Sequence, residues 1–105
     1  MSIKFDGEYV KDGFRKIANL IDGKNLREGT SRGGKILGNI ASGEEVREGS
    51  SRGGKVLCNI KDGKHIRQGS SSGGSKECSL ADAAKEIGAS SHGPSTALVW
   101  WFFCR

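Results

Sequence analysis

Residues 39–57 read NIASGEEVREGSSRGGKVL, and residues 19–37, twenty positions earlier, read NLIDGKNLREGTSRGGKIL. Eleven of the nineteen aligned positions are identical. A third copy, residues 59–74, reads NIKDGKHIRQGSSSGG and matches the second at nine of its sixteen positions. A degenerate copy around Asp6-Gly7 precedes them. Four tandem units therefore cover roughly residues 3–76, and such a period indicates a repeat architecture.

Each unit has the pattern of a β-hairpin. A Gly-containing pair sits between two short apolar stretches, and Asp-Gly there is typical of a two-residue type I′ turn. The second connection of each unit, for example GSSRGG, is a longer Gly/Ser-rich loop. We expect a meander of about eight short strands. The four turn pairs are Asp6-Gly7, Asp22-Gly23, Ser42-Gly43 and Asp62-Gly63.

A two-residue turn would fix the register of the strands and hence their faces. One face then carries Leu57, Asn59 and Ile66, with Leu37, Asn39, Val46 and Ile17, Asn19, Leu26 as equivalents; the other carries Val56, Cys58, Ile60 and Arg67, with Ile36, Ile40 and Arg47 as equivalents. Both faces are partly apolar, whereas an open sheet with one wet face alternates more cleanly. The hairpins are therefore expected to curl around a small centre, barrel- or propeller-like, unless another segment covers the second face.

Asparagine recurs at one position, as Asn19, Asn39 and Asn59. These side chains are expected to be structural, because a buried amide must be hydrogen-bonded. Backbone groups of the Gly/Ser loops, which repeat in step with them, are the expected partners. The alternative is a ring of ligand-binding amides.

The pattern changes after Gly74. Residues 79–88 predict a helix capped by Ser79 and ended by Gly88, with Leu80, Ala83, Ala84 and Ile87 as its apolar stripe. Residues 94–105 suit a helix beginning at Pro94 or, by their β-branched and aromatic content, a strand; we favour the helix. This segment holds Trp100 and Trp101 and is expected to be the structural hydrophobic plug of the repeats.

The predicted fold is therefore mainly β (α+β), with a curled hairpin meander capped by one or two C-terminal helices. Residues 1–105 are expected to form one domain, with repeats at 3–76 and a helical cover at 79–105.

Composition bounds the class of protein. The chain has 105 residues, 17 glycines, a net charge of +5 and no apolar run near the ~20 residues of a spanning helix. Its three cysteines form no CxxC pair, and an odd count without a secretory signal favours reduced thiols. We expect a cytoplasmic protein without a membrane partner or a cofactor.

No catalytic constellation or metal site is apparent. His65 and His92 have no Cys, His or carboxylate at metal-ligand spacing. Ser, His and Asp can still assemble in space, so a small hydrolase remains an alternative.

Recurring cations form the best candidate site. Five arginines and two lysines occupy repeated strand and loop positions, beside Ser hydroxyls and Gly amides that suit anionic oxygens. The simpler interpretation is a solvated face, in which glutamates at 28, 44, 45 and 48 pair with the arginines. The anion-binding candidates are Arg27, Arg47, Arg67, Arg32, Arg52, Lys35 and Lys55.

The repeat unit resembles small bacterial proteins built from tandem hairpin repeats, to which no activity is assigned. The residues that carry the resemblance are Asp62-Gly63, Ile66-Arg67, Gly69-Ser70-Ser71, Lys55-Val56-Leu57 and Asn59-Ile60. The resemblance implies architecture and carries over no catalytic residue. A looser likeness to MORN repeats lacks their longer period and Tyr-Gly signature, so it implies no function.

We therefore expect a non-enzymatic binding or interaction module. The alternative is binding of nucleic acid or another polyanion through the cation positions. Self-association through unpaired hairpin edges is a third possibility.

The repeats alone bury too little for a stable domain of this size. Deleting residues 94–105 is therefore expected to unfold the protein. Circular dichroism during heating tests this: a truncated chain that keeps its strand signal and a cooperative transition contradicts it.

Overall fold

The computed structural model describes residues 3–31, 33–41, 44–50, 53–71, 73–90 and 92–105. Within them, nine strands form one antiparallel sheet in which each strand pairs with the next along the chain. Two helices follow, α1 (Leu80–Ile87) and α2 (Pro94–Phe103). The strands are β1 (Ile3–Phe5), β2 (Tyr9–Asp12), β3 (Arg15–Asn19), β4 (Asn25–Glu28), β5 (Ile36–Ala41), β6 (Glu45–Glu48), β7 (Val56–Asn59), β8 (His65–Gln68) and β9 (Lys76–Ser79).

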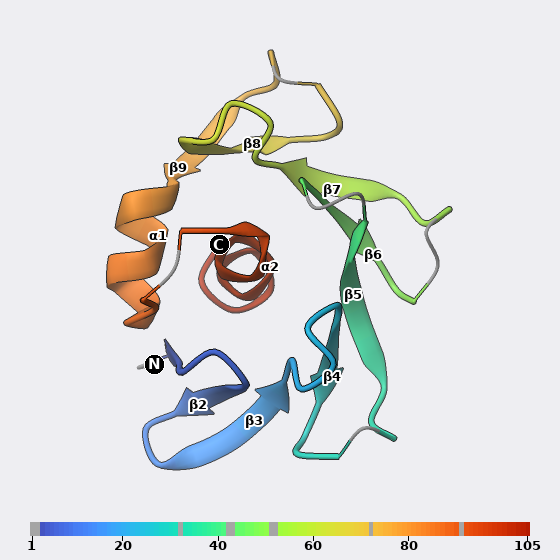
Figure 1. The fold of residues 1–105 in the computed structure, drawn as a ribbon, viewed down its shortest axis with the longest axis vertical. Helices are drawn as coiled ribbons and strands as arrows, with labels where there is room; N and C mark the ends of the chain where they lie inside the picture. The colour runs from blue at the N-terminus through green and yellow to red at the C-terminus, as the bar shows by residue number, and fades with distance from the viewer. Residues whose placement is uncertain (1–2, 32, 42–43, 51–52, 72, 91) are drawn as a thin grey trace.

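The sheet bends into an open ring around α2, which Figure 1 shows end on. In the described residues β1 and β9 do not pair; α1 lies between them and contacts both. The molecule measures 37 × 29 × 19 Å. A ten-residue helix is about 15 Å long, so α2 crosses most of the thickness of the ring. The predicted hairpin meander with a C-terminal helical cap is confirmed.

Four strand pairs project outward from the ring, and we call them the first to fourth petals: β2–β3, β4–β5, β6–β7 and β8–β9. Each petal contains a register shift at the same place. In the third petal Val46 pairs with Cys58 and Arg47 with Val56, so Leu57 is an extra residue. Such bulges bend a strand and increase its twist, which suits a sheet that must curve around a helix.

The predicted assignment of side chains to faces was wrong. Asn59 pairs with Arg67, as Asn39 pairs with Arg47 and Asn19 with Arg27, so asparagine and arginine share one face. The two-residue turns predict a register one residue away from this, and a slip of one residue moves every side chain to the other face. The inner face instead carries Leu26, Val46 and Ile66 beside Gly38, Cys58 and Cys78.

The turn chemistry explains this error. Gly23 and Gly63 have positive φ, +77° and +72°, as expected of turn glycines. However, the connection between β3 and β4 has five residues rather than two. Its aspartate, Asp22, accepts hydrogen bonds from the backbone N–H groups of Lys24 and Asn25. The structure also has a ninth strand: β9 pairs with β8 and continues the sheet to Ser79.

The centre of the ring is filled by α2, the predicted hydrophobic plug. The segment is a helix, with Pro94 in its first turn. Residues 96–100 are buried, including Leu98 and Val99, and a helix that is apolar all round is one surrounded by protein. A helix also satisfies its own backbone hydrogen bonds in a centre where a lone strand would have no partner.

Helix α1 begins where the repeat ends. Ser79 occupies the repeat position of the asparagines, and its Oγ accepts a hydrogen bond from the backbone N–H of Asp82 as the N-cap. Gly88 ends the helix at φ +64°. The buried stripe is the predicted one, Leu80, Ala83, Ala84 and Ile87.

Close packing of the petals on α2 gives a test of this arrangement. A Cβ on Gly38 would lie 2.5 Å from Cε2 of Phe102 and 2.9 Å from the carbonyl oxygen of Arg47. Gly38→Ala is therefore expected to lower the free energy of unfolding by about 1–3 kcal/mol through overpacking, measured by urea denaturation. Combining it with Phe102→Leu should recover part of the loss. Equal stability of Gly38→Ala and the natural chain would contradict the packing.

Candidate binding site

The strand arginines of the predicted anion site have partners inside the protein. Each donates through Nη1 to a glycine carbonyl seven residues further on: Arg27 to Gly34 at 3.4 Å, Arg47 to Gly54 at 2.9 Å and Arg67 to Gly74 at 2.9 Å. Each also forms an ion pair with a carboxylate: Arg27 with Asp22 at 3.6 Å, Arg47 with Glu45 at 2.9 Å and Arg67 with Asp62 at 2.8 Å. Their side chains are only 17–22 % exposed. These arginines hold loops to strands.

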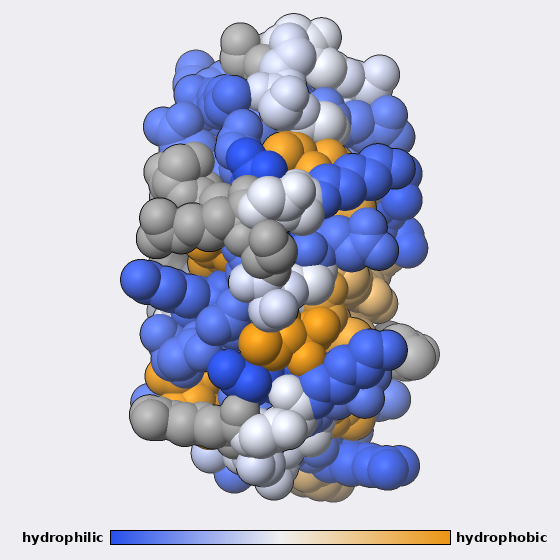
Figure 2. Space-filling model, turned by 90° about the vertical axis from the view of Figure 1, so that its right-hand side faces the viewer, coloured by the Kyte–Doolittle hydropathy of each residue, from blue (hydrophilic) through white to orange (hydrophobic). Residues whose placement is uncertain are grey.

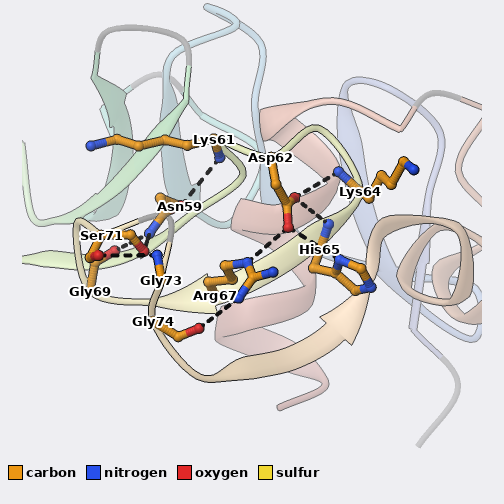
Figure 3. A network of polar contacts seen from close by, with 10 residues as sticks. All are labelled: Asn59, Lys61, Asp62, Lys64, His65, Arg67, Gly69, Ser71, Gly73 and Gly74. Atoms are coloured by element: carbon orange, nitrogen blue, oxygen red, sulfur yellow. Dashed lines mark hydrogen bonds and ion pairs between the residues drawn. The ribbon is translucent and has the colours of Figure 1, made fainter.

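The asparagines hold the first part of the same loops, whose end is bonded by the arginines (Figure 3). Asn59 Nδ2 donates to the carbonyl oxygens of Gly69 at 2.7 Å and Ser71 at 3.1 Å. Asn19 bonds Gly29 and Ser31 in the same way, and Asn39 bonds Gly49. The Gly/Ser loops are the partners expected from the sequence. Asn and Arg, which lie opposite each other in the strand pair, together clamp the loop that follows.

Carboxylates in the connections between petals complete the clamp. Partial burial would raise the pKa of Asp22, but hydrogen bonds from Asn25 and Lys24 outweigh it and, with Arg27, lower that pKa to about 2. Backbone N–H groups of His65 and Lys64, followed by Arg67, hold the pKa of Asp62 well below its usual range. Both groups are therefore charged at neutral pH and cancel their arginine partners.

Exposed cations lie at a different repeat position. Lys35 and Lys55 precede β5 and β7 and are exposed, whereas Arg32 and Arg52 lie outside the described residues. Arg15, at the start of β3, is also exposed and was missed by sequence reasoning. The signal was available: Arg15 precedes Asn19 by four residues, as Lys35 precedes Asn39 and Lys55 precedes Asn59. We call Arg15, Lys35 and Lys55 the petal cation row.

Two clefts lie beside members of this row. The 3–4 cleft, between the third and fourth petals, has a volume of about 390 Å³. The 1–2 cleft, between the first and second petals, has a volume of about 410 Å³. Their lining residues are repeat equivalents: Lys55, Val56, Leu57, Gln68 and Gly69 in one, and Arg15, Lys16, Ile17, Glu28 and Gly29 in the other, where Leu37 joins them.

Aromatic side chains of α2 line both clefts. Trp101 faces the 3–4 cleft with Arg105, and Phe103 faces the 1–2 cleft. Phe102, between them in sequence, packs on Gly38 of the second petal. Successive helix residues point about 100° apart, so these three side chains of α2 reach different parts of the ring. On the flank of the ring shown in Figure 2, apolar patches lie among hydrophilic side chains.

Trp100 is buried instead and donates through Nε1 to Glu86 of α1 at 2.9 Å. Both predicted structural tryptophans thus contact the core, but only Trp101 also lines a cleft.

The histidines gather in a third pocket, of about 350 Å³, lined by His65, His92, Lys64, Gly63 and residues 79–81. His65 Nδ1 lies 3.2 Å from Asp62, and Ser79 is directly across the strand pair from His65. Ser79 Oγ acts as the cap of α1, and the described contacts include no hydrogen bond between Ser79 and His65. The Ser79 hydroxyl is therefore engaged in the cap of α1.

The described residues contain no group of three or more His, Cys, Asp or Glu side chains that could hold a metal ion. No described helix is long and apolar enough to cross a membrane. The three cysteines are free thiols, and burial raises the pKa of the Cys58 thiol to about 12.

A ring of tandem hairpins around a central helix defines a β-hairpin repeat protein. Residues 2–79 match the 6-fold beta flower protein family, and the chain belongs to it. The match covers every strand and stops where α1 begins. No curated protein and no solved structure matches the chain.

The loop clamp generates a stability prediction. Asn59→Ala leaves the carbonyls of Gly69 and Ser71 without their amide partner, so it should cost about 1–3 kcal/mol in urea unfolding. The matched control is Asn25→Ala, whose exposed side-chain bond goes to Asp22, and its cost should be smaller. Equal losses in the two variants would contradict a buried clamp.

Proposed function

We propose that the protein is a non-enzymatic binding module that takes a polyanion, specifically nucleic acid, along the petal cation row. The observation that carries the proposal is the repetition of an exposed cation at one position of three successive petals. A polymer with evenly spaced phosphates is the natural counterpart of evenly repeated cations. Because its three cysteines are free, we further propose that it acts in the reducing cytoplasm.

The distribution of charge supports this row over the strand arginines. Arg27, Arg47 and Arg67 each have their own carboxylate, so their charges cancel and the net charge of +5 belongs to the remaining residues. Moving one of these arginines onto a phosphate would break its bond to a loop carbonyl. The exposed Arg15, Lys35 and Lys55 make no such bond through their side chains in the described contacts.

Neighbouring acids limit the strength of the proposed contact. Glu28 and Glu48 flank the row, since their backbone N–H groups bond the carbonyls of Lys35 and Lys55 at 2.9 Å. Gln68 replaces the glutamate at the equivalent position of the fourth petal. Affinity should therefore be modest and depend steeply on salt.

The triple variant Arg15→Gln/Lys35→Gln/Lys55→Gln tests the row. Fluorescence anisotropy with a labelled single-stranded oligonucleotide, repeated over a range of salt, should show weaker binding and a log–log salt slope smaller by about 2–3, because each lost phosphate contact removes a little under one unit.

Lys4→Gln/Lys24→Gln/Lys85→Gln is the matched control. It changes three exposed residues and lowers the net charge equally, and its salt slope should equal that of the natural chain. Equal slopes in the two triple variants would show that only total charge matters. Absence of binding at low salt would overturn the proposed function itself.

A further inference from the structure

The 3–4 cleft differs from the 1–2 cleft in one decisive way: the described residues that line it include no carboxylate. It is lined by Lys55, Val56, Leu57, Gln68, Gly69, Trp101 and Arg105. The 1–2 cleft has Glu28 where this cleft has Gln68, and the second repeat has Glu48 there. Replacing a carboxylate by a neutral amide removes the group that would repel an anion while keeping a hydrogen-bonding side chain.

Arg105 forms an ion pair with Glu77, which offsets part of its charge and fixes its position. Its Nε donates to Oε1 of Glu77 at 2.6 Å, and its guanidinium lies over the Trp101 ring at 4.0 Å from the centroid. Among the described residues, its Nη1 and Nη2 atoms make no other hydrogen bond. A guanidinium fixed through one edge presents its remaining N–H groups together, which is the geometry that phosphate and carboxylate oxygens accept.

The other wall of the cleft is apolar. Val56 and Leu57 are half-buried and Trp101 packs on the core. Its volume, about 390 Å³, is at the small end of ligand pockets and admits one small ligand. The lining therefore has a cationic half, Lys55 and Arg105, and an apolar half. A ligand with an anionic group and a planar ring would contact both halves. Because the Arg105 guanidinium lies over the Trp101 ring, a base can stack on that guanidinium plane and contact the apolar wall beside it.

We propose that the 3–4 cleft binds one nucleotide unit, with its phosphate at Lys55 and Arg105 and its base against Val56, Leu57 and Trp101. The unit has two sources, a free mononucleotide or an unpaired residue of a nucleic acid strand. The second source rests on the proposed function; the first does not.

The test is a titration of the full chain with AMP, followed by the indole N–H signals of the two tryptophans in NMR spectra. The Trp101 signal should shift, whereas that of Trp100, which is buried and bonded to Glu86, should not. Adenosine and inorganic phosphate, each lacking half of the ligand, should bind at least about tenfold more weakly, because each leaves one half of the lining unpaired.

Gln68→Glu restores the carboxylate that the other repeats carry and should weaken AMP at least about tenfold. Because glutamate stands at this position in two sister units, the variant should fold. Lys24→Gln is the matched control, since it makes the same charge change at an exposed residue outside both the cleft and the petal cation row, and it should leave the Trp101 response unchanged.

The proposal is overturned if AMP does not move the Trp101 signal up to about 10 mM, above the ~1 mM dissociation constant of a weak ligand. It is also overturned if inorganic phosphate binds as well as AMP, or if Gln68→Glu has no more effect than Lys24→Gln.

A short single-stranded oligoadenylate and its duplex with the complementary strand separate the two sources. Equal Trp101 shifts with AMP and the single strand, and none with the duplex, support an unpaired residue as the ligand. A shift with AMP alone supports the free nucleotide. If AMP binds here while the petal cation row variants leave oligonucleotide binding unchanged, the cleft stands and the row fails.

Discussion

The close approach of α2 to the inner face of the hairpins is the constraint on which the rest of the ring depends. No petal has a core of its own, because the buried side chains of the strands join a single cluster with those of α1 and α2. Small residues, Ala18, Gly38 and Cys58, hold the repeat position nearest the centre, and at Gly38 even a Cβ would collide with Phe102. The aromatic residues of α2 can therefore reach outward between petals, which is how Trp101 and Phe103 come to line clefts.

The outer face is organised by polar bonds instead of apolar packing. Asn59 and Arg67, paired across two strands, hold the loop of residues 69–74 through its carbonyls, and the earlier repeats do the same. This explains the twenty-residue period: an asparagine, an arginine eight residues later and two carbonyl-bearing glycines must recur together. It also shows why a repeated arginine is weak evidence for a ligand, since repetition of a structural clamp produces the same pattern.

Much of the architecture could be predicted from the sequence, because hairpin repeats, the Ser79 cap and the stripe of α1 are local patterns. The register could not. Aspartate in the connections accepts backbone hydrogen bonds around a loop longer than a two-residue turn. The longer loop shifts the strand register by one residue, and this shift exchanges the faces of the strands. Of the predicted anion-binding residues, Lys35 and Lys55 are exposed, whereas Arg27, Arg47 and Arg67 are clamps, which the sequence pattern alone could not distinguish. The clefts could not be predicted, because they form where a C-terminal helix meets repeats far away in sequence.

A ring of equal repeats gives equal positions, so specificity can arise only where the repetition breaks. Ser79 replaces asparagine, and the sheet gives way to α1, which occupies the sector between β9 and β1. Gln68 replaces glutamate, and the cleft beside it loses its only carboxylate while gaining Arg105 from the chain beyond α2. The first break ends the ring and the second changes the charge of one cleft. The repeats therefore supply a scaffold with two similar clefts, and a single departure from the repeat decides which of them suits an anion.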